Sequence, residues 1–211
     1  TEMIKALTAM NFEEMTKKEK NLSNATNFII RQIYTAINND GNLHKLQKEV
    51  MDLVEKTLPK MNEVREKSYD KKIQKALSEG KDTSKIKKNL VEMPTPTSWI
   101  NYGRLELFLK CSKNPDYLAL PIQSAQETIK TVIQDWKSFF EALKEYKKNP
   151  SKFTGKPRIP SYAKNSKKTI TFSNQDAVIK DGKYLKLPKT KEKLNIGKIG
   201  FLKKNQKLME V

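Results

Sequence analysis

The apolar residues of this chain change their spacing once, at Asn149–Pro150, and this change most constrains the fold. Before it, apolar residues recur every three or four positions, the period of a helix with one buried face. After it, short segments alternate apolar and polar residues at every second position, as strands do. The sequence therefore predicts an α+β fold, with a helical part packed with a small antiparallel sheet.

The clearest helix runs from Pro121 to Lys148, and others are expected before it. The apolar stripe of this helix is Ile122, Ala125, Ile129, Val132, Trp136, Phe140 and Leu143. The other predicted helices span Asn21–Ile37, Leu43–Leu58, one or two exposed segments within Lys60–Leu90, and Tyr102–Leu109, which Thr97–Ser98 can cap. Pro59 ends the second of them, because proline disrupts a helix interior. We expect Asn114–Pro115–Asp116 to form a turn.

The part after Asn149–Pro150 contains extended segments. Phe153–Tyr162 holds two prolines and a glycine and predicts an extended, turn-rich segment, which we call the strap. A hairpin is predicted over Val178–Leu187, with Asp181–Gly182 at its turn. Further strands are expected at Lys168–Phe172, Lys198–Leu202 and Leu208–Val211. The last of these stops in mid-sheet, which suggests a fragment of a longer protein.

The charge of the chain is strongly basic and lies mostly at its C-terminal end. The chain has 42 basic and 24 acidic residues, a net charge of +18. From Lys144 to Val211 there are 19 basic and 5 acidic residues, whereas the first 143 residues have 23 and 19. Such a one-sided excess is typical of a surface that binds a polyanion. Because the segment predicts strands and turns rather than an amphipathic helix, nucleic acid is favoured over a membrane surface.

The sequence contains no complete active site. There is one histidine, His44, which we interpret as a surface residue, and no phosphate-binding glycine loop. The lone Cys111 can form neither an internal disulfide nor a zinc cage, and we interpret it as a small buried residue near a helix end. No apolar run approaches the length of a membrane span, so we expect a cytoplasmic chain without a membrane partner. An independent enzyme is not expected, and no cofactor is predicted.

The candidate site is a set of basic residues in and around the strap, which we call the basic cluster. Its members are Lys152, Lys156, Arg158, Lys164, Lys167 and Lys168. They surround Phe153 and Tyr162, and mixed basic and aromatic residues are typical of grooves that bind single strands or heteroduplexes. The two aromatic residues have a second interpretation, which is that they only pin the strap to the sheet. Lysine outnumbers arginine, which favours holding the phosphate backbone over reading many bases.

Four sequence motifs, in order, resemble motifs of the TnpB (OrfB) proteins of bacterial insertion sequences. Lys20–Gln32 resembles the early "KNLYNxANYxIRQ" helix, and Leu120–Phe140 resembles the "LPSQxAQQ…WKSFF" helix. Phe153–Tyr162 resembles the "FxGKPRxPxY" strap, and the segments Ile170–Gln175 and Leu185–Pro188 resemble the "FTFxNQ…LKLP" strands. The resemblance covers most of the chain between residues 20 and 188.

This resemblance implies an architecture and partners. TnpB proteins are RNA-guided DNA endonucleases related to type V CRISPR effectors and encoded beside transposases. The implied domains are an N-terminal segment (1–19) that is a candidate part of the β domain, a helical recognition lobe (20–149), and the strap with a wedge-like β-barrel or sheet domain (150–211). A RuvC-like nuclease that uses Mg²⁺ is expected beyond the end of this chain. The implied partners are guide RNA and target DNA.

The resemblance also implies residues that read a short motif beside the target. The positions that match the family's readers are Tyr102, Ile122, Gln123, Gln126, Ser173 and Asn174. Glutamine and asparagine pair bidentately with adenine, which fits a motif rich in A and T. The alternative function is a stand-alone DNA-binding protein of a mobile element, with its helices acting as a helix-turn-helix.

Overall fold

The computed structural model describes residues 10–39, 41–96, 98, 100–165, 169–173, 176–181, 183–191, 193–197 and 208–209. These residues form helices and two small antiparallel sheets, so the α+β class is confirmed. None of the described helices is both long and apolar enough to cross a lipid bilayer. The strand expected at Lys198–Leu202 lies outside the described residues.

The chain divides into two compact units that differ from the expected domains. One unit comprises Thr1–Phe28 and Pro115–Val211, and the other comprises Ile29–Asn114. Helix α6 (Ile122–Lys148) therefore belongs with the strap and the strands, whereas the sequence placed it in a helical lobe over 20–149. The reason is packing, because α6 contacts both strand β1 and the turn that leads into the strap.

Helix α6 is the core of the first unit and spans the predicted residues. Ala125, Ile129, Val132 and Trp136 of the predicted stripe are buried. Ile122 is not part of the core, because its side chain is 65% exposed. It occupies the first helical position, just after Pro121, beyond the surface that the rest of the stripe covers.

Helix α2 (Phe12–Ile37) begins well before the expected Asn21. Asn11 and Glu14 form a reciprocal cap, in which Asn11 Oδ1 accepts from Glu14 N at 2.8 Å and Glu14 Oε2 accepts from Asn11 N at 3.1 Å. This pattern satisfies two free amide groups at a helix start. Just before it, Met10 forms an isolated parallel bridge with Thr190, so the described end of the N-terminal segment does join the β region.

The expected turn at Asn114–Pro115–Asp116 is instead the start of a short helix, α5 (Pro115–Ala119). Lys113 adopts a left-handed conformation with φ of 55°, which reverses the chain before the helix. Proline is favourable at a first helical position because its φ is already helical and no amide hydrogen is needed there. The turn is therefore one residue earlier than predicted.

The strands form two short sheets rather than a closed barrel. Strand β1 (Phe172–Ser173) pairs with β5 (Leu208–Met209), and β2 (Val178–Lys180), β3 (Tyr184–Lys186) and β4 (Lys193–Asn195) form a three-stranded antiparallel sheet. The predicted hairpin is confirmed, and Asp181 in its turn has a φ of 52°. The described strand near Lys168–Phe172 is only two residues long, and β4 was not predicted. The prediction of a barrel is therefore wrong for the described residues, and the alternative of a small antiparallel sheet is the one observed.

The second unit contains α3 (Lys45–Ser78) and α4 (Tyr102–Cys111). Pro59 lies inside α3, so the predicted end at Leu58 is wrong. Proline in a helix interior costs about 3 kcal/mol, yet the helix continues because Val54 and Met61 on either side of it are buried where α3 packs on α4.

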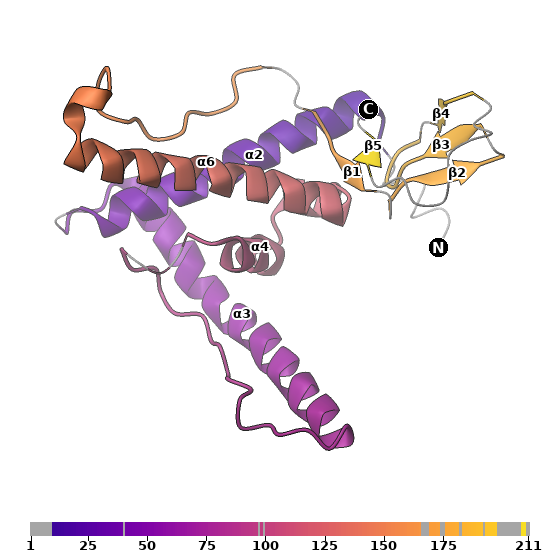
Figure 1. The fold of residues 1–211 in the computed structure, drawn as a ribbon, viewed down its shortest axis with the longest axis horizontal. Coiled ribbons are helices and arrows are strands. Elements are labelled where there is room, and N and C mark those ends of the chain that lie inside the picture. Colours follow the sequence, from indigo (N-terminus) through magenta and orange to yellow (C-terminus); the bar gives the residue numbers. More distant parts are fainter. Residues whose placement is uncertain are drawn as a thin grey trace. The chain divides into compact units, whose positions relative to one another are not determined.

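The segment after α3 runs back along the helix in an extended conformation (Figure 1). Asn62 of α3 binds the backbone of Val91 in both directions, at 2.7 and 3.0 Å, and Lys88 pairs with Glu66 at 2.8 Å. The part of Lys60–Leu90 that follows Ser78 is therefore not helical, although the sequence predicts a helix there. Helix α4 is capped by Asn101, whose side chain accepts from Arg104 N at 2.9 Å, and not by Ser98, which lies three positions earlier. Thr97, the other expected cap residue, lies outside the described residues.

Candidate nucleic-acid interface

The strap leaves the C-terminal end of α6 through the 3-10 turn η1 (Pro150–Lys152) and returns along the helix (Figure 1). At its start, the ring of Phe153 packs edge-on against Tyr146 of α6, with 5.7 Å between centroids. Phe153 thus pins the strap to helix α6, and not to the sheet as the second interpretation expected. Tyr162 at the other end is more open, with 36% of its side chain exposed.

Two asparagines of α2 hold the far end of the strap, and we call them the asparagine clamp. Asn27 donates to the carbonyl oxygens of Pro160 and Ser161 at 3.2 and 3.0 Å, and its own oxygen accepts from Trp136 Nε1 at 2.9 Å. Asn24 accepts from Ala163 N at 2.8 Å and donates to Ala163 O at 3.3 Å. Because Asn27 and Trp136 are buried, these bonds fix the strap backbone between α2 and α6.

The basic cluster contains both paired and unpaired charges. Lys152 pairs with Glu145 of α6 at 3.1 Å, and hydrogen bonds from Asn149 and Lys152 lower the pKa of the Glu145 carboxyl. Lys156, Arg158 and Lys164 are exposed, and none of them forms an ion pair with another described residue. Lys167 and Lys168 lie outside the described residues. The strap therefore offers charged groups to a polyanion without an internal competitor.

A second basic surface, which the sequence analysis missed, lies on one face of the three-stranded sheet. The strand register places Lys186 directly opposite both Val178 and Lys193, and Tyr184 opposite both Lys180 and Asn195. Residues opposite one another share a face, so Lys180, Lys186 and Lys193 lie together, and all three are exposed. Leu185 and Leu194 point to the other face, where Leu185 is buried. We call the first face the lysine face.

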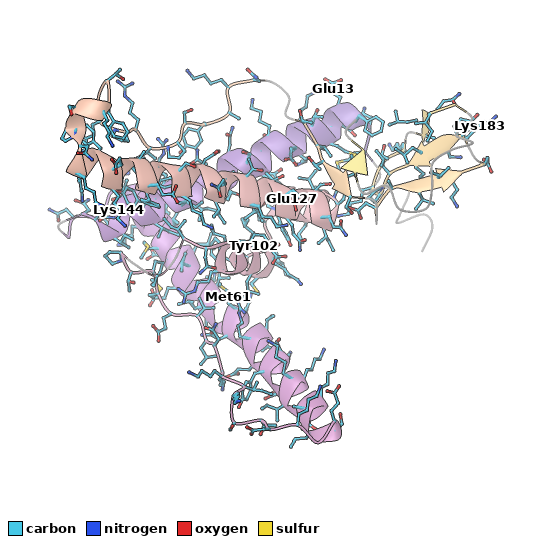
Figure 2. The ribbon with its side chains drawn as sticks, in the orientation of Figure 1. Glu13, Met61, Tyr102, Glu127, Lys144 and Lys183 are labelled. Atoms are coloured by element: carbon cyan, nitrogen blue, oxygen red, sulfur yellow. The ribbon has the colours of Figure 1, made fainter. Side chains whose placement is uncertain are left out.

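The signal for the lysine face was present in the sequence but incomplete. The alternation within Val178–Lys180 and Tyr184–Lys186 could have shown which residues of the hairpin share a face. The reason is that successive residues of a strand point to opposite sides of the sheet. The third member, Lys193, lies on β4, which is too short to be recognised. The ammonium group of Lys183, in the β2–β3 turn (Figure 2), lies 5.0 Å from the centroid of the Tyr184 ring.

Lys189 shows that an exposed basic residue in this region can already be engaged by the protein. Its Nζ donates to the carbonyl oxygens of Leu118 and Leu120, at 2.7 and 2.8 Å, at the end of α5. Burial lowers the pKa of this amine. Lys189 therefore joins the β region to the helices and is not a candidate for binding phosphate.

The structure brings together two of the proposed motif-reading residues. The hydroxyl of Ser173 on β1 donates to Oε1 of Gln123 in the first turn of α6. It also lies 3.5 Å from Asp176, whose pKa is raised by burial. Gln126 is half-buried on the same helix, three positions after Gln123. These polar groups adjoin the exposed Ile122.

The other two proposed readers are not placed with this cluster. Tyr102 is the first residue of α4 in the second unit and is half-buried (Figure 2). Asn174 lies outside the described residues. Gln123, Gln126 and Ser173, together with Ile122, are therefore the proposed readers that the structure describes in the first unit.

The residues considered for catalysis have structural positions. His44 is the exposed N-cap of α3, where its Nδ1 accepts from Leu46 N at 3.3 Å and its backbone N donates to Gln47 at 2.7 Å. Cys111 is the half-buried last residue of α4, and burial raises the pKa of its thiol. Within the described ranges, no three His, Cys, Asp or Glu side chains are grouped to hold a metal ion.

Comparison with protein-family models, curated proteins and solved structures found no match for this chain. The functional assignment therefore depends on the two basic surfaces, the polar cluster at the start of α6 and the short motifs of the sequence.

Proposed function

We propose that this chain is the nucleic-acid-binding N-terminal part of a TnpB-like RNA-guided DNA endonuclease, which binds guide RNA and target DNA. The observation that carries the proposal is the unpaired, exposed charge of Lys156, Arg158 and Lys164 on a strap held by the asparagine clamp. The lysine face adds a second such surface in the same unit. A fixed backbone with free cationic side chains is suited to phosphates at regular spacing.

The proposal assigns backbone binding and sequence reading to different groups. Lysine ammonium groups interact with phosphate as point charges and carry no base information, so most specificity comes from pairing between guide and target. The wedge-like domain of such proteins corresponds here to the strap and the two sheets. The RuvC-like nuclease, with its Mg²⁺, would supply the cleavage chemistry that this part does not.

A short flanking motif would be read at the start of α6. Gln123 and Gln126 present amides of the kind that pair with adenine, and Ser173 orients Gln123 by its hydrogen bond. The exposed Ile122 adds an apolar surface suited to the methyl group of thymine. Tyr102 and Asn174 complete the proposed set of readers, and the combination fits a motif rich in A and T.

The test is a salt titration of binding to three probes of equal length: a structured RNA, an RNA–DNA hybrid and a DNA duplex. We expect affinity to fall linearly with the logarithm of salt concentration, because bound phosphates release counterions. We expect the RNA and the hybrid to bind at least as tightly as the duplex. A flat titration contradicts the proposal, and a clear preference for duplex DNA supports the helix-turn-helix alternative.

A further inference from the structure

Residues of the strap and of α6 line an open groove on the surface. Its volume is about 440 Å³, which is within the range of small-ligand sites. Its apolar walls include Phe139 from the helix and Pro157 and Pro160 from the strap. Two charged residues also line it, Asp135 from the helix and Arg158 from the strap. These two do not pair with each other or with any other described residue, although they share one groove.

Asp135 and the backbone of Arg158 lie at different levels along α6. Asn27 bonds both Trp136 and the carbonyls of Pro160 and Ser161, which places that part of the strap at the level of Asp135. Phe153 packs on Tyr146, so the strap runs antiparallel to the helix. Arg158 therefore lies farther toward the C-terminal end of α6 than Asp135 does.

A ligand for this groove needs three parts in a row: an anionic group, a flat apolar ring and a hydrogen-bond donor. Arg158 favours the anion, since a guanidinium binds phosphate oxygens in pairs. The proline and phenylalanine walls favour a ring, which stacks on such surfaces. The carboxylate of Asp135 repels phosphate but accepts from an amino group.

We propose that this groove holds one unstacked nucleotide of a bound single strand whose base carries an amino group. The phosphate lies on Arg158, the base lies between the prolines and Phe139, and its amino group donates to Asp135. Cytosine, adenine and guanine meet this requirement, whereas uracil and thymine do not. The inference depends on the proposed nucleic-acid binding and adds a selective subsite to it.

The test compares single-stranded oligo(rC) and oligo(rU) of equal length and equal end label, bound to the full chain at one salt concentration. Asp135→Ala should lower the ratio of the two affinities about fivefold, because it removes the acceptor for the amino group. Glu141→Ala is the matched control, since it removes an exposed carboxylate of α6 outside the groove. It should leave the ratio unchanged.

A second variant fills the groove. Ala142→Trp places a large ring among the lining residues and should weaken oligo(rC) binding at least fivefold, whereas Gln134→Trp, exposed on the same helix outside the groove, should not. Thermal unfolding by circular dichroism checks that both variants fold. An unchanged ratio in Asp135→Ala, or equal binding by the two tryptophan variants, overturns the subsite while leaving the proposed function intact. A wild-type chain that binds neither oligonucleotide overturns both.

Discussion

At the scale of single residues, lysines of the same formal charge differ in what they can bind. Lys152 is paired with Glu145, Lys189 donates to two carbonyl oxygens, and Lys156 and Lys164 have neither kind of partner among the described residues. A net charge of +18 therefore overstates the number of groups available to a phosphate backbone. Burial and pairing decide which of them take part.

The first prediction concerns the pair of Lys152 and Glu145. Lys156→Ala and Arg158→Ala should each weaken RNA binding and lower the salt slope by about one, whereas Lys152→Ala should do less, because Glu145 already neutralises that charge. Glu145→Gln should strengthen binding by releasing Lys152. Fluorescence anisotropy over a salt series measures both quantities. Equal effects of the three basic substitutions would contradict the prediction.

The pair also has a defined dependence on pH. The pKa of Glu145 in the folded chain lies below its ordinary value, so the pair is complete above that ordinary value and is lost only as the pH falls through the lower, folded pKa. The difference in binding between Glu145→Gln and wild type should therefore persist at pH 5 and disappear in stronger acid. If this difference in binding disappeared near neutral pH, the ion pair of Lys152 and Glu145 would not be the cause of the difference.

The second prediction concerns the polar cluster at the start of α6. If the proposed function holds, Gln123→Ala and Ser173→Ala should each change the accepted flanking bases in the full-length protein, since Ser173 orients the Gln123 amide. The double substitution should change them no more than Gln123→Ala alone. Gln126→Ala should alter a separate position. Depletion of randomised flanking motifs measures each profile, and an unchanged profile would show that these residues do not read bases.

At the scale of elements, the sequence predicts some segments well for identifiable physical reasons. The apolar residues of α6 follow one face for its whole length, so the helix is recognised at both ends. Helix α3 is misjudged at Pro59 because the packing that offsets the proline comes from α4, which is distant in sequence. The lysine face depends on strand pairing, and a three-residue strand such as β4 carries too little pattern to reveal it.

The third prediction uses the lysine face. Lys186 and Lys193 are directly opposite, and like charges in such a pair are destabilising. Lys193→Glu creates an opposite-charge pair and should raise the free energy of unfolding by about 0.2–1 kcal/mol at low salt, less at high salt. The same substitution should weaken RNA binding. Urea unfolding and anisotropy measure the two effects.

Lys191→Glu is the control, because Lys191 is exposed next to β4 but has no partner in the strand register. Lys191→Glu changes the net charge by the same amount as Lys193→Glu does, but it should not raise the free energy of unfolding. If Lys193→Glu destabilises the chain, the register of β3 and β4 is wrong. If it stabilises the chain and leaves binding unchanged, the lysine face does not contact nucleic acid.

The fourth prediction tests the asparagine clamp. In Asn27→Asp the carboxylate can still accept from Trp136, but it has no hydrogen to donate to Pro160 and Ser161. Trypsin should therefore cut after Arg158 or Lys164 faster than in wild type. Asn27→Ala also leaves the buried Trp136 donor unsatisfied and should cost a further 1–3 kcal/mol of stability, about the cost of such a group. Unchanged proteolysis in Asn27→Asp would mean that the strap is held by other contacts.

At the scale of the whole molecule, the distribution of ion pairs separates the charged regions. Ion pairs within the described part of the chain join residues before 131, such as Lys18 with Asp116 and Lys88 with Glu66, and one further pair, Lys152 with Glu145, lies just before the strap. Helix α3 carries several of these pairs along its own surface. From the strap onward, the described basic residues have no such acidic partners. The strap and the lysine face therefore present basic residues without such partners, whereas Lys67 and Lys75 of α3 are paired with Glu63 and Glu79.

The fifth prediction follows from that distribution. When the full chain binds structured RNA, modification by an amine-reactive ester should slow at Lys156, Lys164, Lys180, Lys186 and Lys193, because each would be covered by phosphate. Lys67 and Lys75 on α3, which pair with Glu63 and Glu79, are the internal controls and should react equally with and without RNA. Lys189 should react slowly in both states, because it is partly buried and donates to two carbonyls. Mass spectrometry of the labelled peptides measures every site in one experiment. Protection of the α3 lysines without protection of the strap and the lysine face would place the binding surface on the second unit.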